Sequence, residues 1–264
     1  MKMEWNFERF VAVLYDQDGV IYPFEVLKER IVPTLWRYVI DLLSEAPISD
    51  DQWQRFGAKL SEAGAWPKII YLAKDFLTGS LGKVGIEASE VRLVLHDAIA
   101  RHPIPNELQL NPGILELLDG FAAASVPQAV VTSSLNPFSV KVLEKLGIVD
   151  RFSFIYTAEN AEREEVEFKP KPGPWFNALR AIGRFGAGPY LLLEDNLINA
   201  TEPVMFDHNC HSVLITRNQM SKLTTEHACK RHLKRFGRED AIERILVVDS
   251  FEELAARMNQ SATA

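Results

Sequence analysis

The stretch VLYDQDGVIY (residues 13–22) joins an apolar run to two aspartates two positions apart, Asp16 and Asp18, followed by a glycine. The apolar run predicts a buried β-strand that ends at the first aspartate. In open α/β sheets, ligands bind beyond the carboxyl ends of the strands, so both carboxylates are expected at a binding crevice. Two acids at this spacing can divide a reaction between a nucleophile and a proton donor and acceptor. Taken alone, residues 16–19 are equally well explained as a polar turn after a strand.

Apolar runs alternate with segments of helical periodicity along most of the chain. The expected strands are residues 10–15, 128–132, 154–157, 190–193, 212–216 and 245–248. Phe138, Val142 and Leu146 recur at four-residue spacing and predict one of the intervening helices. This order predicts an α/β fold, a doubly wound, mostly parallel sheet covered by helices on both faces.

A long segment with little strand signal separates the first expected strand from the second. Apolar residues from Leu27 to Val39 share one face of a helix, and residues 67–77 and 87–102 predict two more. We therefore expect a second, smaller, all-helical cap domain inserted into the α/β core. The expected division is a core of residues 1–22 and 107–264 and a cap of residues 23–106.

Three further segments bear polar side chains near strand ends. TSS (residues 132–134) offers small hydroxyl and amide donors suited to phosphate oxygens, although such a triplet is more often a helix cap. FKPKPGPW (168–175) places two lysines among prolines, where a cation can face an anionic group, although a loop lysine is usually solvated. YLLLEDN (190–196) ends in two acids, which are hard oxygen ligands suited to Mg²⁺ but are common in exposed turns.

Together and in this order, the four segments resemble the motifs of the haloacid dehalogenase superfamily of phosphotransferases. VLYDQDGVIY is similar to its first motif, VVTSS to its second, KPKPGPWFNALRAIG to its third and LLLEDN to its fourth. The resemblance implies a Rossmann-like core and a Mg²⁺ cofactor. It also implies that Asp16 is the nucleophile and a metal ligand. Asp18 is implied as the general acid and base, with its backbone carbonyl on the metal.

The resemblance assigns the remaining site residues as well. Thr132 and the backbone amide of Ser133 would bind the phosphoryl group, and Lys169 would neutralise charge around it. Glu194 and Asp195 would complete the metal site. Lys169 is preferred to the other lysine of its loop because it stands at the family's usual distance from the LRAIG helix segment.

The same resemblance narrows the reaction. The dehalogenases of the superfamily lack the second acid of the first motif, so Asp18 indicates phosphoryl transfer. The expected function is magnesium-dependent hydrolysis of a small phosphate monoester, a sugar phosphate or similar metabolite, through an aspartyl phosphate. The helical segment is similar to the cap of the β-phosphoglucomutase-like subgroup. Two alternatives stay open: a phosphomutase, and a catalytically silent phosphate-binding or regulatory protein of the same fold.

Composition limits the partners. The net charge of -7 disfavours a nucleic-acid binder, and residues 227–238, although basic, suit a solvated helix face. No apolar run reaches the length of a membrane span, and the amino terminus lacks the pattern of a secretory signal, so we expect a cytoplasmic protein that binds a small phosphorylated metabolite. The sequence leaves the oligomeric state open.

Other features lie in the last third of the chain. Six histidines and cysteines between residues 208 and 232 invite comparison with a zinc site, but their spacings match no common zinc pattern, so a strand edge and a helix face are preferred. Asn199 stands where related members commonly have glycine, and its tolerance of left-handed backbone is expected to preserve the turn. Residues 218–241 predict a helical insertion without an assigned role.

Overall fold

One sheet of six parallel strands, in the order β3-β2-β1-β4-β5-β6, organises the part of the chain that the computed structural model describes, residues 7–44, 48–63, 66–83, 85–216 and 221–261. The strands are β1 (Val13–Tyr15), β2 (Gln128–Val131), β3 (Phe154–Tyr156), β4 (Tyr190–Glu194), β5 (Cys210–Ile215) and β6 (Ile245–Val248). Each lies within or beside an expected strand, which confirms the doubly wound α/β fold. The buried apolar runs explain the arrangement, because a parallel sheet is covered on both faces.

Helices cover the two faces of the sheet in separate sets. α5 (Ile114–Ala123), α6 (Asn136–Lys145) and α11 (Phe251–Ser261) pack with Val13 and Tyr15 of β1. α8 (Gly173–Ala181), α9 (Leu197–Phe206) and α10 (Lys222–Arg235) pack with Leu14 on the opposite face. The alternation follows from the period of two along a strand. The remaining short helices are η1 (Phe7–Arg9), η2 (Val149–Arg151), α7 (Ala158–Arg163) and η3 (Glu239–Arg244).

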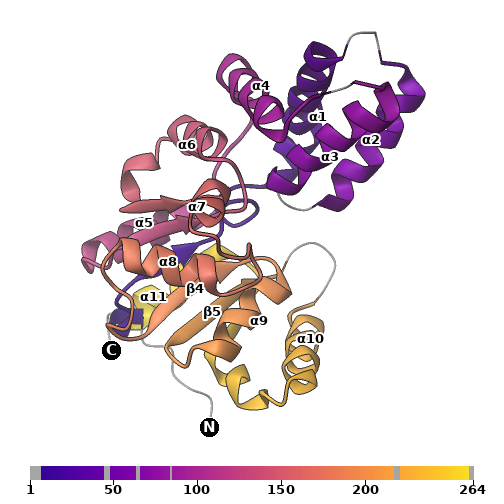
Figure 1. Cartoon of the computed structure of the whole chain (residues 1–264). Helices are drawn as coiled ribbons and strands as arrows, with labels where there is room; N and C mark the ends of the chain where they lie inside the picture. The colour runs from indigo at the N-terminus through magenta and orange to yellow at the C-terminus, as the bar shows by residue number, and fades with distance from the viewer. Residues whose placement is uncertain (1–6, 45–47, 64–65, 84, 217–220, 262–264) are drawn as a thin grey trace.

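Four of the helices between β1 and β2 do not cover the sheet. They are α1 (Phe24–Leu43), α2 (Asp50–Ala63), α3 (Trp66–Leu81) and α4 (Ala88–Arg101), and Figure 1 shows them as a group beside the sheet rather than on its faces. All four lie inside residues 23–106, the segment that we predict as the cap; those boundaries stay a prediction. α2 had no counterpart among the expected helices.

The outgoing and returning connections of this helical group lie side by side. Asn111, on the returning segment, donates its backbone N–H to the carbonyl of Ile21 at 2.9 Å. Its side-chain amide donates to the carbonyls of Gly19 and Val20, each at 2.8 Å. These hydrogen bonds therefore hold the returning segment against residues 19–21, in the last part of the first motif.

Candidate active site

The site lies at the point in the sheet where the strand order reverses. From β1 the chain winds outward through β2 and β3, then returns to the other side for β4, β5 and β6, so the ends of β1 and β4 face a topological switch point. Asp16 follows β1 directly, Glu194 is the last residue of β4, and the Asp16 N–H donates to Leu193 O at 2.9 Å. Gly19, at φ +86°, turns the chain away from the sheet in a conformation that favours glycine.

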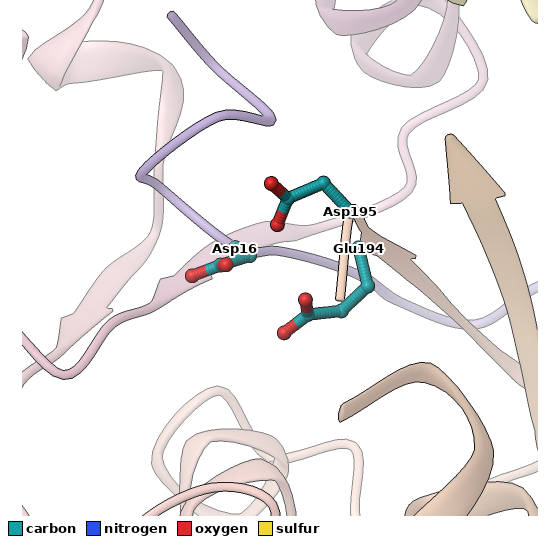
Figure 2. Close-up of side chains that lie close together, drawn as sticks. All are labelled: Asp16, Glu194 and Asp195. Carbon is teal, nitrogen blue, oxygen red and sulfur yellow. The ribbon is translucent and has the colours of Figure 1, made fainter. Parts of the chain in front are cut away.

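Three carboxylates meet at these strand ends. Asp16, Glu194 and Asp195 each offer an oxygen within 4.8 Å of the others, and Figure 2 shows them side by side. Lys169 joins the group: its Nζ donates to Asp16 Oδ1 at 2.5 Å and to Glu194 Oε1 at 3.0 Å. Lys171, the alternative in the same loop, is exposed. Three acids around one ammonium leave an excess of negative charge, and this donor set fits a hard divalent cation.

Burial and neighbouring charges shift the pKa values of Lys169 and Glu194. Burial alone lowers the pKa of Lys169, but the charges of Asp16 and Glu194 outweigh it and hold that pKa above its ordinary value. Burial and the nearby Asp16 charge raise the pKa of Glu194, with Lys169 opposing them. The ammonium of Lys169 also lies 4.9 Å from the centroid of the buried Trp175 ring. Lys169 is thus fixed as a cation at the centre of the group.

Asp18 has a different environment. Tyr22 donates its hydroxyl to Asp18 Oδ1, and Ser134 donates its hydroxyl to Oδ2 at 3.1 Å. Burial is the largest influence and raises the pKa of Asp18 to about 6, with the Asp16 charge adding to it and the two hydroxyl donors opposing it. A carboxyl with this pKa exchanges protons close to neutral pH, as a general acid and base requires.

The second motif lies at the end of β2. Ser133 lines the same cavity as Asp16, Asp18 and Lys169. Thr132 is buried beside it, and its hydroxyl oxygen accepts the Ser134 N–H at 3.1 Å. Ser133 therefore lines the cavity and Thr132 adjoins it, and the phosphate-binding roles of both residues stay a prediction.

The cavity has a volume of about 490 Å³ and lies between the strand ends and helices α1, α2 and α3. That volume is typical of small-molecule sites, roughly 300–1,000 Å³. Asn199 lies on the sheet side of the cavity, and its side-chain amide donates to Glu194 Oε2 at 3.4 Å.

Comparison with known proteins bears on this arrangement. A sequence profile of the haloacid dehalogenase-like hydrolases matches residues 10–207. The chain belongs to this family. The match confirms the resemblance read from the four motifs, and it assigns the chain to a family of hydrolases. A search among curated proteins finds no match.

Solved structures of the family share its fold. CbbY from Rhodobacter sphaeroides in complex with phosphate is 19% identical, with 95% of this chain and 99% of that chain covered at a TM-score of 0.59. A β-phosphoglucomutase from Clostridium difficile is 19% identical, with 97% and 100% covered at 0.54. A HAD phosphatase from Thermococcus onnurineus is 18% identical, with 93% and 96% covered at 0.59. At these identities the likeness shows the fold.

Three further features of the sequence can be compared with the structure, and the expectation for one of them is wrong. Asn199 lies inside α9 without a positive φ, so the expected left-handed turn is wrong; the side chain of Asn196 begins the helix by accepting the N–H groups of Ile198 and Asn199. Cys210 and Cys229 are buried in β5 and α10, and among the described residues only the carboxylates of the site form a group of three metal-ligand side chains. The described part of the 218–241 insertion forms α10 and η3, while residues 218–220 lie outside it.

Within the described residues, no helix is both long and apolar enough to cross a membrane.

Sequence reasoning missed Tyr22 and Gln17 as contributors to the site. Gln17 is fully buried, and its side-chain amide donates to Tyr22 Oη at 3.3 Å. A polar residue between two acids was the available signal, but it did not indicate which side chain it would meet.

Proposed function

We propose that this chain hydrolyses small phosphate monoesters in two steps, with Asp16 as the nucleophile and Mg²⁺ as the cofactor. One observation carries the proposal: a carboxylate held by Lys169 at 2.5 Å lies in the same cavity as a second carboxyl, Asp18, whose pKa is about 6. A fixed anion beside a proton-exchanging acid is the pair that covalent phosphoryl transfer needs.

In the first step, an oxygen of Asp16 attacks phosphorus while the bond from phosphorus to the ester oxygen breaks. Oδ1 accepts hydrogen bonds from the Gln17 N–H at 2.8 Å and from Lys169, which orients the carboxylate and leaves Oδ2 for the attack. Protonated Asp18 gives its proton to the departing oxygen. The products are the free alcohol and an aspartyl phosphate on Asp16.

In the second step, Asp18 accepts a proton from a water molecule as the water oxygen attacks phosphorus. The bond between phosphorus and Asp16 breaks, inorganic phosphate leaves, and Asp18 is protonated again. Lys169, Thr132 and the Ser133 backbone amide would stabilise the phosphoryl oxygens in both steps.

Asp16, Glu194, Asp195 and the backbone carbonyl of Asp18 would hold the magnesium ion. When bound, the ion offsets the repulsion between the phosphate and the surrounding carboxylates. The protein's own part is to bring the three carboxylates together at the switch point, with Asp16 and Glu194 buried and Asp195 partly buried.

The test compares the wild-type protein with Asp16→Asn and Asp18→Asn on a panel of phosphate monoesters with MgCl₂. Asp16→Asn should lower kcat by roughly 10³-fold or more, and rapid-quench mass spectrometry should detect a phosphorylated protein only when Asp16 is present. Asp249→Asn is the matched control, because this exposed aspartate also follows a strand of the sheet, β6. Wild-type turnover by Asp16→Asn would refute the covalent route.

The same assay separates the alternatives. Inorganic phosphate released in step with the loss of ester indicates hydrolysis, whereas an isomerised sugar phosphate without free phosphate indicates a mutase. Binding of phosphate and Mg²⁺ with no turnover of any ester would indicate a silent binding protein.

A further inference from the structure

The half of the cavity that faces the proposed phosphoryl site is lined by apolar side chains of the helical group. They are Phe24, Val32 and Pro33 of α1, Trp53 and Leu60 of α2, and Trp66 and Ile69 of α3. Among the described residues on this side of the cavity, Lys28 has the one charged side chain. The leaving alcohol of a substrate would therefore meet hydrocarbon and aromatic rings.

This lining is distinct from the interior of the helical group. Trp36 and Phe56 are fully buried and pack against each other in that interior, whereas Phe24, Trp53 and Leu60 are only partly buried and face the cavity. A concave apolar surface left open to water is unfavourable, and such surfaces mark binding sites. A ligand with an apolar body would cover it.

A sugar phosphate fits this lining poorly. Most of its hydroxyl groups would lose hydrogen bonds to water and face hydrocarbon, because Lys28 and the two indole N–H groups are the few side-chain donors that the described helical residues offer there. An alkyl or aryl group of similar size loses nothing of this kind and removes apolar surface from water on both sides. The lining thus favours a monoester of an apolar alcohol or phenol.

Lys28 is placed on the apolar stripe of α1. Phe24, Lys28 and Val32 are spaced four residues apart and share one face of the helix, and all three line the cavity. No described residue forms a hydrogen bond or an ion pair with the Lys28 ammonium group. A cation on a cavity-facing stripe, with no partner among the described residues, is suited to an anionic group on the ligand.

We propose that the substrate is a phosphate monoester of an apolar alcohol or phenol that carries one carboxylate, with the apolar body against α1, α2 and α3 and the carboxylate on Lys28. This inference rests on the proposed phosphatase activity and specifies its substrate class. Hydrolysis breaks the bond between phosphorus and the ester oxygen, consumes one water, and releases the hydroxy acid and inorganic phosphate.

The test uses esters that differ in one feature. 3-(4-Phosphooxyphenyl)propanoate carries the carboxylate, its propanamide analogue replaces the carboxylate by a neutral amide of the same shape, and glucose 6-phosphate replaces the apolar body by a polyol. Wild-type kcat/KM should be about tenfold higher for the propanoate than for the amide, since one charge pair separates them. Both aryl esters should exceed glucose 6-phosphate.

Variants locate the two contacts. Lys28→Gln should lower kcat/KM for the propanoate about tenfold more than for the amide and so remove the preference, and Lys28→Arg should keep the preference. Val32→Thr, which keeps the side-chain shape but adds a hydroxyl, should lower kcat/KM for both aryl esters relative to glucose 6-phosphate. Equal losses on all three esters in Lys28→Gln would place Lys28 on the phosphoryl group instead and overturn the proposal, as would a wild-type preference for glucose 6-phosphate.

Binding to Asp16→Asn separates failure of this inference from failure of the proposed function. Isothermal titration calorimetry on that variant should give a lower Kd for the propanoate than for the amide, and Lys28→Gln in the same background should equalise the two. If the ligand preference appears in binding while the wild-type protein hydrolyses nothing, the substrate class stands and the phosphatase activity fails. Equal Kd values for all three ligands would reject the substrate class.

Discussion

At the scale of single residues, the two aspartates of the first motif have different environments, as the different roles that we propose for them require. Asp16 is fixed by Lys169, while Asp18 is partly buried and accepts from two neutral hydroxyl donors. The ion pair holds the first carboxylate in place, whereas burial raises the pKa of the second to about 6 against the opposing effect of its two hydroxyl donors. The division of work therefore depends on neighbours that lie outside the motif's two acids.

Tyr22→Phe should test one of those neighbours. The change keeps the buried ring but removes the hydroxyl that donates to Asp18, so kcat on an alkyl or phenyl phosphate should fall by about tenfold, the effect of one lost hydrogen bond to a charged group. Because that bond lowers the pKa of Asp18, its loss should raise the pKa above about 6 and move the alkaline limb of kcat/KM to higher pH. Tyr38→Phe is the control, because the wild-type Tyr38 hydroxyl donates to Asp97 on α4. An unchanged pH profile would contradict the positioning role.

The cluster of three carboxylates leads to a second prediction, which concerns the effect of Mg²⁺ on Tm. In EDTA their mutual repulsion opposes folding, so Asp195→Asn should raise Tm relative to the wild type. With MgCl₂ at about 100 times Kd, the wild type should gain about 2.7 kcal/mol, or several degrees in Tm, and Asp195→Asn should gain much less. Differential scanning fluorimetry in EDTA and in MgCl₂ measures both, with Asp249→Asn as the control. A magnesium response that Asp195→Asn leaves intact would rule out this ligand set.

At the scale of secondary structure, buried strands were predicted well because their side chains are apolar on both faces. Boundaries were less predictable: β5 includes His211, a buried polar residue that pattern reading excludes. α2 escaped prediction because Trp53, Phe56 and Leu60 are its few large apolar residues, and its main contact is with α3. Its stability comes from packing that the local sequence does not record.

For the candidate site, too, the local sequence predicted some residues and not others. Motif order located Asp16, Lys169 and Glu194, because each follows or adjoins a recognisable strand or proline-rich loop. Tyr22 and Lys28 were not found, since their importance depends on which elements come together in space. A tyrosine in a turn and a lysine on a helix carry no sign of that role in their local sequence.

Gly113 tests the junction of two helices. It begins α5 at φ +85°, and a Cβ there would lie 2.4 Å from Glu252 N and 2.5 Å from Phe251 C at the start of α11. Gly183 is the matched control, since it has φ +67° and open space around it. Gly183→Ala should cost about 1–2 kcal/mol of unfolding free energy from backbone strain, and Gly113→Ala clearly more, because backbone atoms must move as well. Urea denaturation measures both, and equal losses would contradict the close approach.

Glu253 joins α10 to α11. Its carboxylate accepts from Lys222 and Arg257, each at 2.8 Å, and from the Asp249 N–H at 2.9 Å. Burial raises its pKa, but these donors outweigh burial and lower the pKa from 4.5 to about 2. The resulting stability is complete above about pH 4.5 and is lost as pH falls towards 2.

Glu253→Gln should therefore lower the unfolding free energy at pH 7 by about 1–2 kcal/mol, a figure reduced for solvent screening of this partly exposed group. The difference from the wild type should shrink between pH 4.5 and 2. Urea denaturation across that range measures it, with the exposed neighbour Glu252→Gln as the control. A difference that does not change with pH would show that the carboxylate charge is not the cause.

At the scale of the whole molecule, a few contacts hold the helical group against the sheet-bearing part. Lys141 of α6 donates to the carbonyls of Ile99, Ala100 and His102 at the end of α4. Trp66 and Phe138 place their ring centroids 5.0 Å apart. Because the cavity lies between the two parts, these contacts bear on how a ligand enters and leaves it.

The ion pair between Arg92 of α4 and Glu162 of α7 permits a direct test of that coupling. Arg92 Nη2 lies 2.9 Å from Glu162 Oε1 and 2.6 Å from Oε2, and both side chains are partly buried. If the closed arrangement is the one that binds substrate, Arg92→Met and Glu162→Gln should each raise KM several-fold by disfavouring it, since a pair of this kind contributes about 1 kcal/mol.

The double variant should resemble the single ones, because the second change removes an interaction that is already lost. Arg101→Met is the matched control: its ion pair with Asp97, at 2.7 Å, lies within α4 and does not cross to the sheet-bearing part. Steady-state kinetics on the four proteins and the control measures the coupling. A rise in KM that is the same in Arg101→Met, or fully additive effects at Arg92 and Glu162, would mean that this contact does not set the closed arrangement. In that case the ring contact of Trp66 with Phe138 would be the next to vary, since Trp66 also lines the cavity.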